Sequence, residues 1–217
     1  MRHNPAHAVA DPGAVRDLVR QNPWATIVSD NAGELVASHY PVLLDENADD
    51  LALLTHVGRP DEELHGFGER EVLVIVQGHH GYLSPSWYGP AGIRAPTWNF
   101  SVAHLYGVPE VLGAEENLAT LTRLVERFEQ FVEEPLYLDQ EWGRQIAKGT
   151  VGLRIPVARF VCKRKLSQDK DDLSRRQAID RLREPGPYKN PDLADEMERE
   201  WEVELAAAKR QAADPEL

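Results

Sequence analysis

The chain has 217 residues, of which 42% are hydrophobic and 28% charged, and its formal net charge is −12. This length and apolar content are enough for one domain with a real core, with or without a helical appendage. The negative charge opposes binding to nucleic acid or anionic membrane, and no Lys/Arg-rich run offsets it. The single cysteine, Cys162, excludes an internal disulfide and a cysteine-based zinc site. No apolar run approaches membrane-spanning length and the first residues lack the apolar region of a signal peptide, so we expect a cytoplasmic protein.

Hydrophobic periodicity and turn residues predict an alternation of strands and helices. In chain order, the predicted elements are a helix at 12–21, strands at 24–29, 34–44 and 51–57, a short helix at 62–68, strands at 72–77 and 97–112, a helix at 115–132, a helical turn at 142–147, a strand at 151–165, and helices at 174–184 and 191–212.

Two details of this pattern bear on the architecture. Asp11 and Pro12 are typical of the N-cap and the first position of a helix. Pro41 and Pro156 interrupt two strands and indicate edge positions or bulges, because proline cannot donate to a ladder. Roughly six to seven strand-forming runs joined by short turns are typical of a small closed barrel.

The composition shifts after Ser167, where a polar segment and then helical patterns follow. The last predicted helix carries one apolar stripe among many glutamates, and this stripe must pack on the barrel or on a second subunit. We therefore expect two parts, a barrel domain over residues 1–168 and a helical C-terminal extension over residues 169–217.

The stretch from Glu71 to Val108 is the most informative of the chain. It opens with a β-branched run suited to a strand covered on both faces. The rest concentrates aromatic rings and hydrogen-bonding side chains beyond the needs of a core. Apolar walls with a few orienting polar groups are what a planar ligand requires, so the stretch predicts a cofactor pocket.

Polar side chains also gather at the end of the strand predicted for residues 51–57. Thr55, His56 and Arg59 together would supply a hydroxyl, an imidazole and a forked guanidinium, the groups of a phosphate cradle. The alternative is that His39 and His56 are hydrogen-bonded barrel-end histidines and that Arg59 pairs with an acidic neighbour.

Three further features bear on possible chemistry. His65 lies on a predicted helical turn and could serve as a haem axial ligand, although a lone histidine of this kind is more often an ordinary core or surface residue. His79 and His80 are adjacent on a strand and point to opposite faces, so we expect no metal site there. No nucleophile motif is present around Ser84, and the sequence assigns no catalytic residue.

Several segments resemble, in the same order, the motifs of PaiB-type proteins. Those motifs are THLPLLL, GHxARxNP, YISPSWY, PTWNY, HVYG and KLSQ, and the matching segments here are SHYPVLL (38–44), THVGRP (55–60), YLSPSWY (82–88), PTWNF (96–100), HLYG (104–107) and KLSQ (165–168). The resemblance runs from the first helix to about Gln168.

The resemblance implies a mainly β fold, the FMN-binding split β-barrel related to pyridoxamine-phosphate oxidases, here with C-terminal helices. It also implies a homodimer whose flavin lies in a groove between subunits. Transferred by position, the cofactor-binding residues are Ser38, His39, Thr55, His56, Val57, Arg59, Tyr82, Ser84, Trp87, Trp98, Asn99, Lys165, Ser167 and Gln168.

PaiB-type proteins are described as negative transcriptional regulators linked to protease and sporulation control. That role fits poorly with the charge of −12 and the absence of a helix-turn-helix signal, so DNA binding, if it occurs, is expected to be indirect. The usual NPQW after GHxAR is replaced by Asp61–Leu64, and the superfamily also includes haem enzymes such as piperazate synthases, which form an N–N bond. A haem- or flavin-dependent oxidoreductase acting on a small amine or amino acid is therefore an alternative, with haem b held by His65 or else His56. A cofactor-free interaction module is a third hypothesis.

Overall fold

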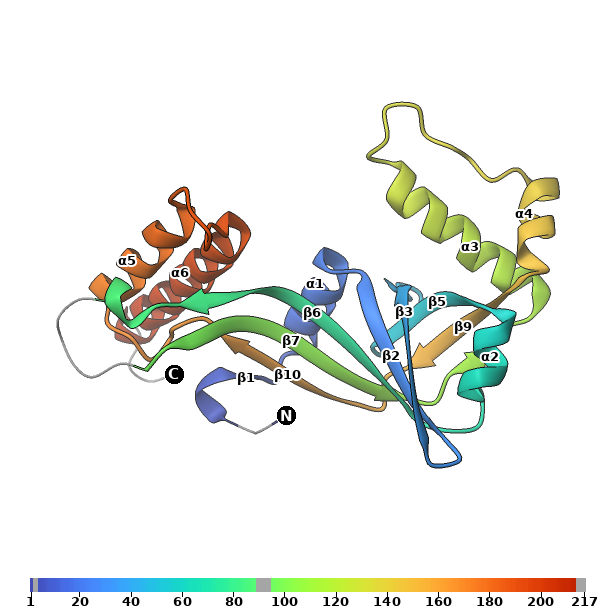
Figure 1. Ribbon diagram of the computed structural model, residues 1–217, viewed down its shortest axis with the longest axis horizontal. Coiled ribbons are helices and arrows are strands. Elements are labelled where there is room, and N and C mark those ends of the chain that lie inside the picture. The colour runs from blue at the N-terminus through green and yellow to red at the C-terminus, as the bar shows by residue number, and fades with distance from the viewer. Residues whose placement is uncertain (2–3, 89–94, 214–217) are drawn as a thin grey trace. The chain divides into compact units, whose positions relative to one another are not determined.

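The structure, a computed structural model, describes residue 1 and residues 4–88 and 95–213 (Figure 1). The described strands form two sheets. The six-stranded sheet has the order β1 (Ala8–Val9), β10 (Arg159–Lys165), β7 (Thr97–Gly107), β6 (Val72–Leu83), β2 (Trp24–Asn31) and β3 (Glu34–Pro41). The four-stranded sheet has the order β4 (Leu43–Leu44), β5 (Ala52–Gly58), β9 (Thr150–Pro156) and β8 (Glu110–Val111).

Helices occupy most of the remaining described chain. They are α1 (Pro12–Gln21), α2 (Arg59–His65), α3 (Ala114–Glu129), α4 (Gln140–Ala147), α5 (Asp172–Arg183) and α6 (Pro191–Ala213), with 3₁₀ turns η1 (Pro5–His7) and η2 (Pro85–Trp87). The predicted mainly β class with C-terminal helices is confirmed. No helix among these described residues is both long and apolar enough to span a membrane.

The expectation of a closed barrel is wrong, because the strands form two separate sheets. The predicted strand at 151–165 is in fact β9 and β10, which belong to different sheets and are separated after Pro156. The strand predicted for 97–112 is likewise divided into β7 and β8 around Pro109. The edge position expected for Pro41 is confirmed, since it ends β3 at the edge of the six-stranded sheet.

The chain divides into two compact units. We call Met1–Val9, Gly78–Ser101 and Lys163–Leu217 the tail unit, and Ala10–Gln77 and Val102–Cys162 the sheet unit. The domain boundary at residue 168 that the sequence suggested stays a prediction.

In the sheet unit, helix α1 begins and ends at the predicted residues. The Asp11 carboxylate accepts hydrogen bonds from the Gly13 and Ala14 N–H groups, as expected of an N-cap. Helix α3 packs on β5 and β9 and buries Leu121 and Leu124 (Figure 1). Its amphipathic stripe therefore closes one side of the four-stranded sheet.

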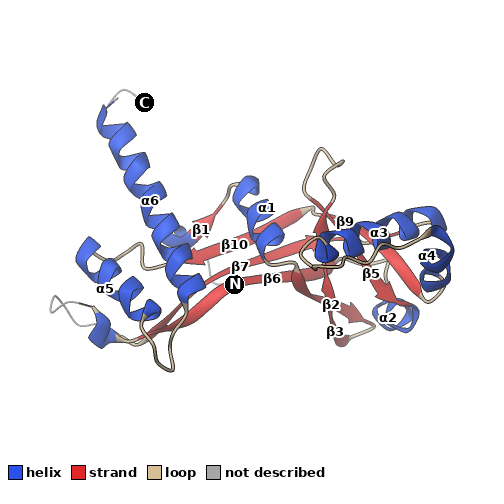
Figure 2. Cartoon of the chain, turned by 90° about the horizontal axis from the view of Figure 1, so that it is seen from above, coloured by secondary structure: helices blue, strands red, loops and turns tan. Residues whose placement is uncertain are grey.

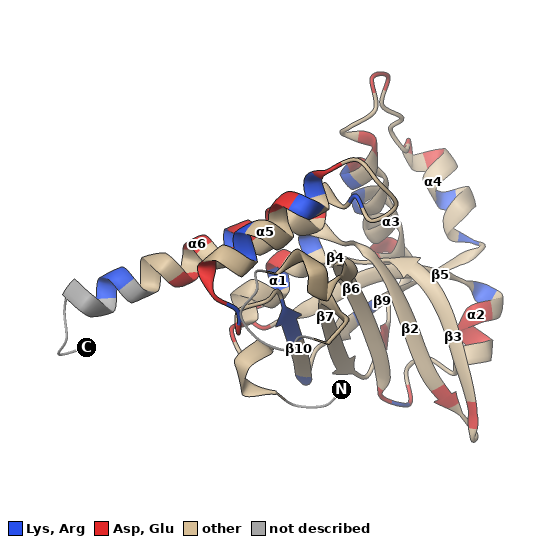
Figure 3. Cartoon of the chain, turned by 60° about the vertical axis from the view of Figure 1, so that its left-hand side comes forward, with Lys and Arg blue, Asp and Glu red and all other residues tan. Residues whose placement is uncertain are grey.

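In the tail unit, α5 and α6 pack against each other (Figure 2). Leu193, Met197 and Trp201 of the predicted stripe are buried in one cluster with Leu83 and Leu166. Basic residues of α5 pair with acidic residues of α6, including Arg176 with Glu198 and Arg183 with Asp195. Figure 3 shows Lys and Arg in blue and Asp and Glu in red along the two helices. These three residues thus pack within their own chain, whereas Leu205, the fourth residue of the predicted stripe, is 40% exposed.

Candidate functional site

Three motif segments that are distant in sequence meet in the tail unit. Asn99 of β7 donates from Nδ2 to the Ser167 Oγ at 2.9 Å and to the Met197 Sδ at 3.4 Å. The Tyr88 hydroxyl lies 3.2 Å from the same Ser167 Oγ. All four side chains are buried, and we call them the Asn99 cluster. Its members come from the PTWNF, KLSQ and YLSPSWY segments and, in the case of Met197, from α6.

Two features of the Asn99 cluster are energetically unfavourable for the folded chain. The Asn99 Oδ1 is buried and has no hydrogen-bond partner, which costs about 1–3 kcal/mol. Ser167 has a φ of 68°, in the left-handed region that residues with a Cβ rarely occupy. Strain and an unpaired polar atom in one cluster are typical of functional sites.

A cavity of about 230 Å³ adjoins this cluster. Its lining is polar and carries two lysines, and consists of Tyr88, Ala95, Thr97, Asn99, Lys165, Ser167, Asp169 and Lys170. The Lys165 ammonium donates to the Trp98 carbonyl at 2.8 Å and to the Thr97 hydroxyl. Burial lowers the pKa of Lys165, and the nearby charge of Asp169 partly opposes this shift. The cavity thus offers a cation beside hydroxyl and amide groups.

Aromatic rings gather on the same unit. The Tyr82 ring lies 6.2 Å from Trp98 and 5.2 Å from Tyr188, measured between centroids, and 6.4 Å from Trp87. Trp98 is more than half exposed, so its ring can stack on a flat ligand. The sequence identified three of these rings, whereas Tyr188, which lies between α5 and α6, was missed.

Two other predicted residues of the tail unit have local partners. The Ser84 Oγ caps η2 by accepting from the Ser86 N–H at 3.3 Å. The Gln168 amide accepts from the Leu166 N–H at 2.7 Å and donates to the Arg164 carbonyl at 2.8 Å. Both side chains shape the turns beside the site. The connection between β6 and β7 includes residues 89–94, which lie outside the described residues.

The sheet unit contains a second polar network, centred on His65. Its Nδ1 lies 2.8 Å from the Ser29 Oγ and its Nε2 lies 3.0 Å from the Ser38 Oγ. Ser38 donates to Asp61 at 2.8 Å, and the Tyr40 hydroxyl donates to the same carboxylate oxygen at 2.5 Å. We call these five residues the His65 network. Since the Ser38 proton goes to Asp61, the His65 Nε2 must carry a proton, and in neutral His65 the Nδ1 accepts from Ser29.

The electrostatics of this network follow from burial and hydrogen bonding. Burial lowers the pKa of His65, and the negative charge of Asp61 partly opposes the shift. The hydrogen bonds from Tyr40 and Ser38 lower the pKa of Asp61. Burial, with the hydrogen bond to Asp61, raises the pKa of Tyr40 to about 12. The network is therefore most stable with a neutral imidazole and an ionised carboxylate.

The structure does not bring the predicted phosphate cradle together. Thr55 is fully buried and donates to the Pro41 carbonyl at 2.7 Å. His56 pairs in register with Gly152, on the face of the sheet where Asn117 of α3 packs. Adjacent residues of a strand point to opposite faces, so Thr55 and His56 cannot serve one site.

The remaining predicted residues of the sheet unit also separate. His39 hydrogen-bonds Thr26 across the hairpin at 3.0 Å, on the face opposite Ser38. Val57 is fully buried in the core. Arg59 donates from Nε to the Lys148 carbonyl at 2.6 Å and has Glu62 3.9 Å away, yet its side chain is 57% exposed. Arg59 is therefore the member of the predicted cradle that can still reach an external ligand.

Histidine, cysteine and carboxylate side chains do not form a metal site in the described part of the chain, where no group of three or more could hold an ion. The His56 Nδ1 is buried without a partner, and burial lowers the pKa of this imidazole. Both nitrogens of His65 are engaged by serine hydroxyls, so iron ligation by His65 would require one of these hydrogen bonds to break.

Comparison with known proteins decides the family. A family model described as "Putative FMN-binding domain" matches residues 1–159. The chain belongs to this FMN-binding domain family. The resemblance to PaiB-type proteins is confirmed by the same match and by a curated relative, Protease synthase and sporulation protein PAI 2 of Bacillus subtilis (strain 168). That relative is 29% identical over 178 residues, which are 80% of this chain and 85% of the relative.

Solved structures of similar fold support the split-barrel assignment of this FMN-binding domain. The FAD and haem binding protein from Mycobacterium smegmatis aligns with a TM-score of 0.56 and 18% identity, over 73% of each chain. The flavocytochrome Anf3 from Azotobacter vinelandii aligns with a TM-score of 0.57 and 14% identity, over 72% of this chain and 68% of that one. At these identities the likeness establishes the fold alone.

Proposed function

We propose that the chain binds FMN and acts as a flavin-dependent redox or sensory protein of the PaiB type. One observation carries the proposal. In a chain that matches an FMN-binding domain, Tyr88, Asn99 and Ser167 belong to separate motifs and yet surround one cavity. Bound flavin would supply the electron-transfer chemistry, while the protein binds and orients the ring.

The residues present suit a flavin in their chemistry. The exposed Trp98 ring offers a stacking surface, and the Lys165 ammonium offers positive charge to ring oxygens or phosphate. Asn99 and Ser167 would orient the ligand, since their side chains are fixed by mutual hydrogen bonding.

The proposed site is larger than the cavity that the Asn99 cluster lines. About 230 Å³ lies below the range of roughly 300–1,000 Å³ that pockets for drug-sized ligands cover. We therefore propose a homodimer, in which a second copy of the chain supplies a further wall for the cofactor.

We propose FMN rather than haem b because of the His65 network. Iron ligation by the His65 Nε2 would break its bond to Ser38, and ligation by Nδ1 would leave the Ser29 hydroxyl unpaired in a buried position. Any regulatory role, which the resemblance to PaiB-type proteins implies, is proposed to act without direct contact to DNA, because the net charge is −12.

An absorption spectrum of the full-length protein, purified without added cofactor, tests the proposal. Flavin bands, with FMN identified after acid release, are the expected result. A Soret band would establish the haem alternative instead, and a protein that stays colourless and fails to bind added FMN would overturn both.

A matched pair of variants locates the site. Asn99→Ala should lower FMN affinity by at least about tenfold. Asn117→Ala is the control, because Asn117 is also a buried asparagine with an unpaired Oδ1 but belongs to the sheet unit. Equal FMN affinity of the two variants would refute the assignment of the site to the Asn99 cluster.

A further inference from the structure

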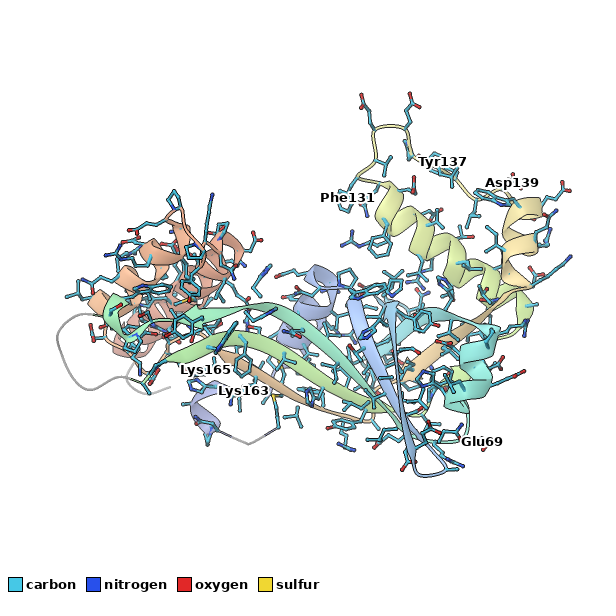
Figure 4. The ribbon with its side chains drawn as sticks, in the orientation of Figure 1. Glu69, Phe131, Tyr137, Asp139, Lys163 and Lys165 are labelled. Carbon is cyan, nitrogen blue, oxygen red and sulfur yellow. The ribbon has the colours of Figure 1, made fainter. Side chains whose placement is uncertain are left out.

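The segment between α3 and α4 exposes an unusual number of large apolar side chains. Phe131 and Tyr137 are 74% and 71% exposed, and Figure 4 shows them at the end of α3 and along the connection toward α4. The exposed apolar residues of this segment are Phe128, Phe131, Val132, Leu136, Tyr137 and Trp142. We call residues 126–142 the 126–142 surface. Gathered apolar side chains of this size on a surface are typical of an interaction site.

The 126–142 surface is also strongly acidic. It carries six carboxylates and only one basic residue, Arg127; the carboxylates are Glu126, Glu129, Glu133, Glu134, Asp139 and Glu141. Among the residues that the structure describes, none of the six forms an ion pair. Their charges are therefore available to an external partner.

Local hydrogen bonds order parts of this surface. The Glu129 carboxylate accepts from the Leu136 N–H at 2.7 Å, and the Val132 N–H donates to the Glu129 carbonyl at 2.8 Å. Asp139 caps α4 by accepting from the Trp142 N–H at 2.8 Å. A surface fixed before binding loses less conformational entropy on association.

A hollow of about 480 Å³ lies beside the surface. It is formed by α3 and the residues before α4, and its lining is Glu115, Leu118, Ala119, Thr122, Arg123, Leu138, Asp139 and Gln140. The guanidinium of Arg123 is already engaged by the Leu44 carbonyl at 3.2 Å. The hollow thus offers leucine walls at an acidic edge, where an apolar side chain of a partner could anchor.

From these observations we infer that the 126–142 surface binds a cationic amphipathic segment of another protein, in helical form. An apolar stripe on such a helix would cover the exposed rings, and its Lys and Arg side chains would meet the carboxylates. A second copy of this chain fits less well, because a symmetric contact through this surface would place the six carboxylates against their own equivalents.

The test uses the full-length protein and a fluorescent synthetic helix of Lys and Leu, designed with one apolar stripe. A shuffled peptide of the same composition, which lacks the stripe, serves as the second probe. Fluorescence anisotropy should show the striped peptide binding at least about tenfold more tightly than the shuffled one. Equal affinity would mean that only net charge is recognised, and would overturn the inference.

Matched variants locate the binding. The double variant Phe131→Ser with Tyr137→Ser should bind the striped peptide at least about tenfold more weakly than the unaltered protein. Leu35→Ser is the control and should leave this affinity unchanged, because Leu35 is 77% exposed on β3, outside the 126–142 surface. The double variant Glu133→Gln with Glu134→Gln should lose more affinity for the striped peptide than the control, Asp49→Asn with Asp50→Asn. Asp49 and Asp50 are an exposed acidic pair elsewhere in the sheet unit.

The same variants also test the competing explanation, that this surface is a contact between two copies of the chain. If Phe131→Ser with Tyr137→Ser converts an oligomer into monomers in sedimentation analysis, while the peptide affinity is unchanged, the surface is a contact between copies of this chain and the inference is wrong.

Discussion

Replacing His65 by alanine should destabilise the protein more than any exposed histidine could. The imidazole is 2% exposed, hydrogen-bonds Ser29 and Ser38, and stacks on Phe67 with ring centroids 4.6 Å apart. Two lost hydrogen bonds, a buried Ser29 hydroxyl left unpaired and the lost ring contact together amount to roughly 3–4 kcal/mol. The lost contacts are those that attach α2 to strands β2 and β3.

Urea unfolding at pH 7.5, followed by circular dichroism, measures this loss as a decrease in the free energy of unfolding. His39→Ala is the control, because His39 is exposed and makes one hydrogen bond across the same hairpin, at 3.0 Å to Thr26. It should cost no more than about 1 kcal/mol. If His65→Ala costs as little as His39→Ala, the imidazole is not held between the two serines and the description of the network is wrong.

Three further results are expected. Burial lowers the pKa of both His65 and His56, so below about pH 6.5 the unfolded chain binds protons that the folded chain does not. The free energy of unfolding should therefore fall as pH decreases from about 6.5 toward the lowered folded-state pKa values. The fall should be less steep in His65→Ala. If urea titrations show the same pH dependence of the free energy of unfolding for the variant and the unaltered protein, the prediction is wrong. Gly107→Ala should destabilise by about 3 kcal/mol or more, because its Cβ would lie 2.0 Å from the Pro156 carbonyl oxygen, and an unchanged melting temperature would contradict the close approach. Met197→Ala should cost about 2–5 kcal/mol in urea unfolding, since the side chain is 1% exposed in the cluster that holds α6, and a smaller loss would indicate that α6 is only loosely docked.

Much of the secondary structure could be predicted because the local signals agree with the tertiary packing. The helix at 12–21 has an N-cap, a proline at its first position and a buried stripe, and the structure reproduces both its ends. The amphipathic pattern at 191–212 likewise predicts the buried face of α6. In α1 the periodicity specifies the buried residues, whereas in α6 it specifies the buried face only up to Trp201, since Leu205 is 40% exposed.

The division into two sheets could not be predicted in the same way. Within residues 151–165, the sequence of each half predicts a strand. The only sequence signal for the break at residues 157–158 is the preceding Pro156. A proline at that place is compatible with an edge, a bulge or a change of sheet. Which of these occurs depends on pairing with β5 in one sheet and with β1 and β7 in the other, which local pattern does not encode.

The candidate site shows a similar limit. Convergence of the PTWNF and KLSQ segments followed from the family resemblance, and the structure joins Asn99 to Ser167. Met197 and Tyr188 were missed, because both lie in the C-terminal extension, beyond the motifs. For Met197, the apolar periodicity of a helix does not indicate that its sulfur will accept a hydrogen bond from an asparagine. The role of Asp61 was also missed, since its importance depends on Ser38 and Tyr40 reaching it from another element.

Strand geometry explains why the motif residues of this family divide as they do. In SHYPVLL, Ser38 and Tyr40 reach Asp61, while His39 turns to Thr26 on the other face. A strand motif of consecutive polar residues therefore supplies two environments, and only alternate members can share a ligand. The Asn99 cluster avoids this restriction because each of its members comes from a different segment of the chain. Because the Ser167 hydroxyl is bonded by both Asn99 and Tyr88, the orientation of each group in the Asn99 cluster depends on all of these segments being in place.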